Sequence, residues 1–276
     1  AVGRDALKAS TVNSSNVAIG AYAMDATNSI SSTECTAVGY ESMSGALAGY
    51  GNTCVGSYTM RVATSALENT AMGKYALIAL TTGDNNTCIG SYAGSVITSA
   101  SNSLLLGKDA GLSGSPGGSI ITDSNYIVLG DENITHADIK VDWTIMSDAR
   151  DKTDFTALDL GLDFVKDLNP VTYKWDMRSK YGDKYADGYD LNAQTPDGTH
   201  KEDWLDIGFK AQEVEALEIA AGYNKSNKTN LTTSLSGDGK QYGIQYTKFV
   251  PILVKAIQEQ QTLIDALTAR ITTLEG

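Results

Sequence analysis

The sequence has little cysteine, proline and histidine: three, four and two residues, respectively, among 276. An odd number of cysteines without Cys-x-x-Cys spacing argues against a disulfide framework and against a zinc site. His136 and His200 lack partners at the spacing of a metal site or a catalytic triad, so we expect no metal and no cofactor. No apolar run of about 18 residues occurs, so we expect no membrane insertion.

Positive charge is also scarce. Lys and Arg total 21 against 33 Asp and Glu, which gives a net charge of −12. This balance argues against a nucleic-acid partner, because basic surfaces bind the phosphate backbone. The first residues, 1–5, lack the features of a secretory signal peptide and begin within a repeated pattern. We therefore expect the chain to be part of a longer protein without a signal peptide.

What the first half does contain is a repeat. A glycine preceded by an apolar residue recurs, mostly every 17 residues, with asparagine often four positions before it and tyrosine two positions after it. A unit this short cannot bury a core alone and must stack on its neighbours, as in solenoids. The glycines are Gly3, Gly20, Gly39, Gly56, Gly73, Gly90, Gly107 and Gly130, with Asn16, Asn52, Asn69 and Asn86, and with Tyr22, Tyr58, Tyr75 and Tyr92.

We predict that residues 1–146 form a mainly β repeat shaft. The apolar pair before each glycine suits a short strand, glycine permits a sharp corner, and Ser, Thr and Asn supply turns. Cys35, Cys54 and Cys88 take small-residue positions before repeat glycines, where we expect buried, reduced thiols. The repeat resembles, with a longer period, the head repeats of YadA-type trimeric autotransporter adhesins. That resemblance implies a β-solenoid-like shaft of three intertwined chains.

Four ordered motifs mark the second half, residues 147–276. They are Ser-Asp-Ala-Arg-Asp-Lys at 147–152, Leu-Asn-Pro-Val-Thr-Tyr-Lys-Trp at 168–175, Gly-Phe-Lys-Ala-Gln-Glu-Val-Glu at 208–215, and Tyr-Thr-Lys-Phe-Val-Pro opening 246–259. Together they resemble the endosialidase-type intramolecular chaperone domain at the C-terminus of phage tailspikes and tail fibres. The resemblance implies an α+β chaperone domain that drives assembly of a homotrimer.

The same resemblance implies autoproteolysis. Ser147 would be the nucleophile and Lys152 the general base, and the cut would fall between Met146 and Ser147. Asp148 and Arg150 would hold the turn around the pair. Without the other motifs, Ser147 and Lys152 would read as a helix N-cap serine and a solvated lysine. The sequence departs from the family pattern at Asp151 and Lys210, where apolar residues are usual.

Five positions on a helix correspond to about 140° of rotation, so a regular helix does not bring Ser147 and Lys152 together. A bend or folded loop must do so. Elsewhere in this half we predict a helix over 157–168 and strands at 171–175 and 244–246, and we expect 222–241 to be a polar loop.

Three further segments carry predictions. Strands are predicted at 126–130 and 139–143, near the end of the shaft. Residues 176–203 are predicted to form an acidic excursion or a long hairpin; their aspartate spacing does not fit a calcium loop, so we expect a solvated loop there. Its carboxylates are Asp183, Asp187, Asp190 and Asp197.

The last segment, residues 247–275, has the pattern of a coiled-coil helix. Its a and d positions form a narrow apolar seam, which is typical of a partner interface. Ile at a with Leu at d nominally favours a dimer, whereas the family resemblance implies a trimer; Gln260 would specify register or oligomeric state. The seam residues are Val250, Leu253, Ile257, Gln260, Ile264, Leu267, Ile271 and Leu274.

Three functions are compatible with the sequence. The favoured one is the distal part of a phage tail fibre in the virion, whose C-terminal chaperone trimerises the chain and is then released by cleavage at Met146–Ser147. The alternative is an adhesin for a host receptor such as a glycan, in which the C-terminal domain trimerises without cleaving. An enzyme acting on a separate substrate is the third, but no carboxylate pair or triad supports it.

Overall fold

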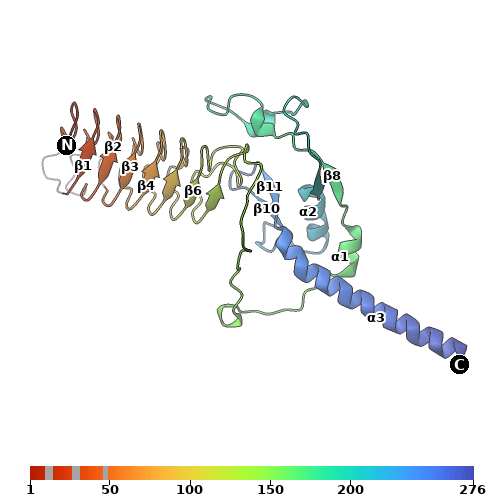
Figure 1. Ribbon diagram of the computed structural model, residues 1–276. Helices are drawn as coiled ribbons and strands as arrows, with labels where there is room; N and C mark the ends of the chain where they lie inside the picture. The colour runs from red at the N-terminus through yellow and green to blue at the C-terminus, as the bar shows by residue number, and fades with distance from the viewer. Residues whose placement is uncertain (10–14, 27–31, 46–48) are drawn as a thin grey trace. The chain divides into compact units, whose positions relative to one another are not determined.

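The structure is a computed structural model that describes residues 1–9, 15–26, 32–45 and 49–276 (Figure 1). The chain forms two compact units. The solenoid unit comprises Ala1–Thr135, Asp176–Lys201 and Ser236–Gln241, and the C-terminal unit comprises His136–Trp175, Glu202–Leu235 and Tyr242–Gly276. Within the described ranges, no helix is both long and apolar enough to cross a membrane.

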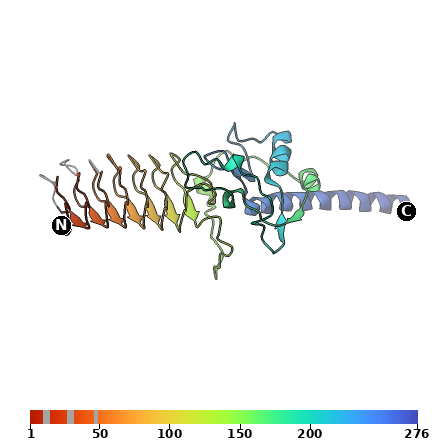
Figure 2. The ribbon, with the colours of Figure 1, turned by 90° about the horizontal axis from the view of Figure 1, so that it is seen from above.

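The solenoid unit is built on one parallel sheet whose strands stack in chain order, one per repeat (Figure 2). The register places equivalent repeat residues side by side, as with Cys54 and Ala71. The predicted β-solenoid and the strand within 126–130 are thereby confirmed. The strands are β1 (Val17–Ile19), β2 (Thr36–Val38), β3 (Thr53–Val55), β4 (Thr70–Met72), β5 (Thr87–Ile89), β6 (Leu104–Leu106) and β7 (Ile127–Leu129).

The solenoid interior contains the central residue of each strand, which is small in most coils, together with larger side chains from between the strands, such as Leu77 and Ile97. Cys54 and Cys88 are fully buried there as free thiols, and Cys35 is buried nearby. Burial raises the pKa of the Cys88 thiol to about 12. Each of these strands pairs with neighbouring coils of its own chain, so the interior closes within one chain without strands from another.

Two repeat positions now have a physical explanation. Asn69 donates to the Asn52 side-chain oxygen from its backbone nitrogen at 2.9 Å, and Asn86 donates to Asn69 in the same way. This buried ladder of amides satisfies backbone groups from coil to coil. Gly73 has φ +128°, and a Cβ there would lie 2.5 Å from the Gly90 carbonyl oxygen, so the stacked corners admit only glycine.

The C-terminal unit surrounds a small core of Leu160, Phe164, Val214, Phe249 and Ile252. Two antiparallel pairs, β8 with β9 and β10 with β11, frame its helices. The elements are η1 (Ala149–Asp151), α1 (Leu162–Asp167), β8 (Val171–Tyr173), β9 (Asp206–Gly208), α2 (Ala211–Ala220), β10 (Thr233–Leu235), β11 (Tyr242–Ile244), η4 (Tyr246–Lys248) and α3 (Phe249–Glu275).

Carboxylate side chains hold these elements together. The Glu218 carboxylate on α2 accepts the Thr232 hydroxyl at 2.8 Å and ties the helix to the hairpin. Glu259 on α3 accepts from the Leu162 backbone nitrogen at 2.7 Å, at the start of α1. Such a carboxylate satisfies an unpaired N–H and complements the helix dipole.

Four sequence predictions for this unit differ from the structure. The predicted helix over 157–168 is shorter, because Gly161 precedes its first turn. Part of the predicted loop 222–241 forms β10, which pairs with β11 slightly earlier than the predicted strand 244–246. Residues 139–143 form no strand, because no strand in the described part of the chain pairs with them.

Candidate functional site

Ser147 and Lys152 are brought into contact by a tight turn. The Lys152 Nζ lies 2.6 Å from the Ser147 Oγ and 3.4 Å from the Ser147 carbonyl oxygen. The turn is the 3-10 helix η1, and Lys152 follows it in extended conformation. This is the bend that a five-residue separation requires, since a regular helix would rotate the lysine away.

Asp148 and Arg150 build this turn. The Asp148 carboxylate accepts from the Arg150 backbone nitrogen at 2.9 Å and from its guanidinium at 2.6 Å. The side-chain hydrogen bonds from Arg150, with the backbone one, lower the pKa of Asp148, and the same contact raises the pKa of Arg150. Neither side chain bonds to the Ser147 hydroxyl, so their contribution is to the shape of the turn.

The surroundings of the pair are open to solvent. Ser147 and Lys152 are exposed, and Met146, on the other side of the candidate bond, is 84 % exposed. A lysine acts as a base only after losing its proton, and desolvation is what promotes that loss. The single chain therefore supplies the contact between nucleophile and base, but it does not supply a dry environment.

The segment that leads into Ser147 is apolar on alternate residues. Ile139, Val141, Trp143 and Ile145 are all exposed, with Trp143 at 75 %. A period of two is typical of a strand with one buried face. In the part of the chain that the structure describes, these four side chains stay exposed and the segment pairs with no strand.

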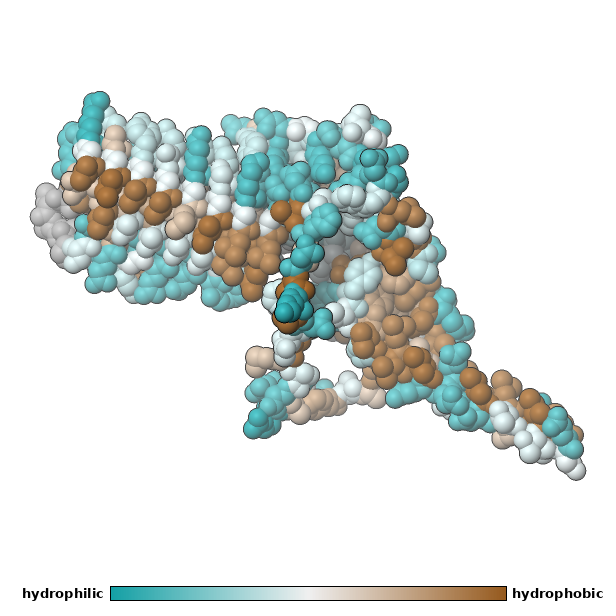
Figure 3. Space-filling model, in the orientation of Figure 1, coloured by the Kyte–Doolittle hydropathy of each residue, from teal (hydrophilic) through white to brown (hydrophobic). Residues whose placement is uncertain are grey.

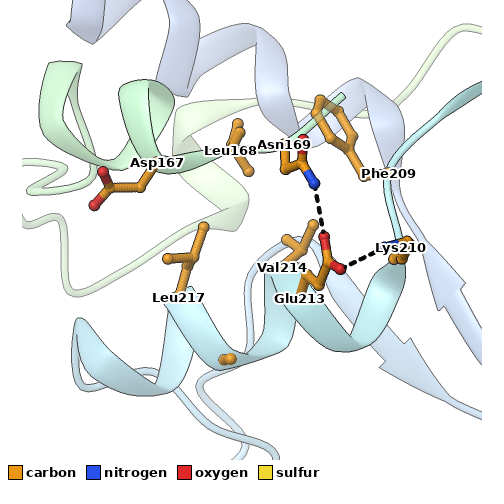
Figure 4. Close-up of a pocket in the computed structure, with 9 residues that line it drawn as sticks. Asp167, Leu168, Asn169, Phe209, Lys210, Glu213, Val214 and Leu217 are labelled. Carbon is orange, nitrogen blue, oxygen red and sulfur yellow. Dashed lines mark hydrogen bonds and ion pairs between the residues drawn. The ribbon is translucent and has the colours of Figure 1, made fainter. Parts of the chain in front are cut away.

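A hollow of about 300 Å³ lies elsewhere in the C-terminal unit, where two of the sequence motifs meet (Figure 4). Leu168 and Asn169 come from one motif, and Phe209 and Glu213 from the other. Glu213 pairs with Lys210 at 2.7 Å and accepts from Asn169 at 3.3 Å. The polar side chains at the rim therefore bond to one another. We interpret the hollow as a gap in the packing between the two motifs.

The acidic excursion has a structural role that the sequence did not reveal. Residues 176–201 belong to the solenoid unit. Their Lys184 side chain contacts residues of the solenoid's last coils. Its Nζ lies 3.0 Å from the Asp109 carboxylate and 2.6 Å from that of Glu132. All three side chains are almost fully buried, so a lysine from the second half neutralises two carboxylates of the solenoid's last coils.

Tyr185 continues the tyrosine stack of the solenoid. Its ring centroid is 4.9 Å from that of Tyr92, and its hydroxyl donates to Asp109 at 2.7 Å. The repeat tyrosines stack on each other from coil to coil, as between Tyr75 and Tyr92 at 4.8 Å. We call residues 176–201 and 236–241 the cap, because they cover the end of this ladder; Asp238 adds a bond to the Ser119 nitrogen at 3.0 Å.

The predicted carboxylates of the excursion do not form a metal site. Asp190 pairs with Lys240 at 2.8 Å, and Asp183 and Asp197 bond within their own turns. Among the described residues, no group of three or more His, Cys, Asp or Glu side chains could hold a metal ion.

The buried charges of the cap predict how stability depends on pH. Burial alone would raise the pKa of Asp109, but hydrogen bonds from Tyr185, Lys184 and Lys108 outweigh it and lower the pKa. Burial alone would lower the pKa of Lys184, but its hydrogen bonds to Glu132 and Asp109 outweigh burial and raise the pKa. A lowered acid pKa stabilises the fold above about pH 4, and a raised lysine pKa stabilises it below about pH 10.5.

We therefore expect the cap's contribution to be constant between these limits. It should be lost as the pH falls through the folded-state pKa of Asp109 or rises through that of Lys184. Urea unfolding of wild type and of Lys184→Met across pH 3 to 8 checks this. The difference between the two should be largest near neutrality and shrink at pH 3; a difference independent of pH would contradict it.

The predicted seam residues are exposed on α3, and Figure 3 shows apolar residues along this helix. Phe249, Ile252 and Ala256, on the neighbouring side of the same helix, are buried in the core. The start of the helix thus buries one stripe in its own domain, and the seam residues stay uncovered. The exposed seam residues are Val250, Leu253, Ile257, Gln260, Ile264, Leu267, Ile271 and Leu274.

Residues 147–223 match the S74 peptidase family, described as the chaperone of endosialidase. The chain therefore carries a chaperone of endosialidase domain, and the resemblance seen in its motifs is confirmed over these residues. The family is one of self-cleaving serine peptidases, and its domains act in trimeric fibres and are typical of phage tail fibres. No curated protein and no solved structure matches the chain.

Proposed function

We propose that this chain is the distal part of a phage tail fibre, whose domain at 147–276 assembles three copies and then cuts the Met146–Ser147 bond once. The observation that carries the proposal is the 2.6 Å contact between Lys152 Nζ and Ser147 Oγ at the first residues of the matched family domain. The solenoid at 1–135 supports it, since a repeat of stacked coils suits a fibre.

The chemistry needs only these residues and water. The Ser147 hydroxyl attacks the carbonyl carbon of Met146 through a five-membered ring while neutral Lys152 takes the hydroxyl proton. The C–N bond breaks, the acyl group passes from the Ser147 nitrogen to its oxygen, and Lys152 returns the proton to the amine. Water then hydrolyses the ester, which leaves a carboxylate on Met146 and a free amine and hydroxyl on Ser147.

Assembly supplies what the single chain lacks. The exposed dyad and the uncovered alternate residues 139–145 lie next to each other in the sequence. We propose that a neighbouring copy covers this segment, removes water from Lys152 and thereby favours its neutral form. Cleavage then reports correct assembly, because Ser147 and Lys152 stay exposed to water in an unassembled chain.

The repeat tyrosines do not support a glycan-binding role. Tyr58 stacks on Tyr75, and Tyr92 packs in tilted contacts between Tyr75 and Tyr185. Arg61 and Lys74 lie over the rings of Tyr58 and Tyr75. These contacts account for the periodic tyrosines as packing between coils, so we assign no receptor to them.

Disrupting the α3 seam is expected to abolish both assembly and cleavage. Ile264→Asp places a carboxylate in the proposed seam, where an unpaired buried charge costs several kcal/mol. The mass by light scattering should fall from three chains to one, and the cleavage rate should drop at least tenfold. Ala269→Asp, on the opposite side of the same helix, is the control and should change neither. Cleavage at the wild-type rate by monomeric Ile264→Asp would refute the coupling.

A further inference from the structure

The outward side of the solenoid sheet carries two regular columns of side chains. In each strand the central residue points inward and the two flanking residues point outward, so the parallel register stacks them from coil to coil. The first column is Val17, Thr36, Thr53, Thr70, Thr87, Leu104 and Ile127, and the second is Ile19, Val38, Val55, Met72, Ile89, Leu106 and Leu129. We call these fourteen residues the sheet face.

The sheet face is apolar and contains no charge. Its second column is aliphatic or methionine in all seven strands, and the first is threonine between apolar ends. All fourteen side chains are partly or fully exposed, and Figure 3 shows apolar residues running along the solenoid. With strands about 4.8 Å apart, the face is about 29 Å long. Apolar patches of this kind on a protein surface are often contact sites.

We infer that the sheet face binds the sheet faces of other copies of this chain. A second copy carries the same side chains at the same spacing, so one aligned contact repeats at every coil. Neither copy would bury a charge, which removes the main cost of closing such a surface. This inference rests on the proposed trimer and assigns its shaft a contact surface.

The two columns of the face fit a ring, and its size makes it a supporting contact. About 29 Å by the roughly 10 Å width of two columns gives on the order of 300 Å², below the 800 Å² or so per partner of a typical stable interface. The sheet face alone is therefore too small to hold the chains together, and its contact supplements the contact made by the α3 seam. A closed ring of three needs two different surfaces on every chain, and the threonine-containing and aliphatic columns supply them.

Accessibility of an introduced thiol tests the inference. Met72 is 42 % exposed in the single chain and lies on the sheet face, whereas Val62 is 44 % exposed and lies outside the strands. We would compare alkylation of Met72→Cys and Val62→Cys by a bulky maleimide in the full chain. The native cysteines are buried and should stay unlabelled. We expect the Met72→Cys thiol to react at least tenfold more slowly than the Val62→Cys thiol.

The mass of each variant, measured in the same samples, separates the possible failures. Equal labelling rates in a protein of three-chain mass overturn the sheet-face contact and leave the trimer standing. Equal rates in a one-chain mass overturn the proposed assembly as well. Slow labelling in a one-chain mass also overturns the inference, since the chain would then cover its own face. Ile89→Cys, in the same column, repeats the test if Met72→Cys does not fold.

Discussion

Ser147→Ala is expected to yield a single uncut chain under conditions in which the wild type is cut. Removing the hydroxyl removes the atom placed to attack the Met146 carbonyl with a base in contact, the Lys152 amine at 2.6 Å. Loss of a catalytic nucleophile lowers a rate by several orders of magnitude, so cleavage should be undetectable by intact mass over days. The mass by light scattering should remain that of three chains, because Ser147 lies outside the α3 seam.

Two variants of Lys152 separate its charge from its role as a base. Lys152→Arg keeps a positive charge beside Ser147, but a guanidinium does not lose its proton in proteins. We expect Lys152→Arg and Lys152→Ala to be uncut alike. Lys166→Ala, at an exposed lysine in α1, is the matched control and should cleave as wild type does. Cleavage by Lys152→Arg at the wild-type rate would mean that Lys152 is not the base.

Lys184→Met is expected to have the largest effect on stability. It leaves the Asp109 and Glu132 carboxylates buried without the ammonium that lies 3.0 Å and 2.6 Å from them. Removing one partner from a buried ion pair costs about 3–5 kcal/mol. Urea unfolding followed by the near-ultraviolet signal of the tyrosine stack would measure the loss.

Two further variants calibrate this result. Tyr185→Phe removes one hydrogen bond to Asp109 but keeps the ring on Tyr92, so its cost should be about 1–2 kcal/mol. Lys201→Met, at an exposed lysine of the same cap, should change stability by less than about 0.5 kcal/mol. Equal free energies of unfolding for Lys184→Met and Lys201→Met would show that the Lys184 contacts of the cap do not stabilise the end of the solenoid.

The cap also affects the fate of the two pieces after cleavage. Lys184, Tyr185 and Asp238 lie after the proposed cut, yet they contact residues before it. Cutting Met146–Ser147 breaks the covalent link and leaves these contacts in place. Release of the chaperone therefore requires a second event that detaches the cap, and the two pieces should elute together until that happens.

The sequence was sufficient to predict the parts of the fold that repeat locally. The glycine spacing predicted the stacked coils, because only glycine fits corners such as Gly73 on Gly90. The heptads predicted α3. The five-residue spacing of Ser147 and Lys152 predicted a bend that brings these two side chains together, and η1 provides it. In each case a short stretch of chain determines the geometry.

The parts that the sequence did not reveal depend on contacts between distant residues. Nothing near Lys184 indicates that it pairs with Asp109, and an acidic loop normally lies in solvent. Alternation at 139–143 predicted a strand, but a strand needs a neighbour that the described part of this chain does not provide. The exposure of the sheet face was not predicted either, because apolar residues in strands are usually taken to be part of the core.

Intact-mass and N-terminal analysis of the freshly made wild-type chain tests the central claim most directly. We predict two pieces whose boundary is Met146–Ser147, the second beginning with Ser147, formed at a first-order rate from a trimer. A single full-length mass in protein already shown to be trimeric would contradict self-cleavage, and so would a cut at another bond that persists in Ser147→Ala.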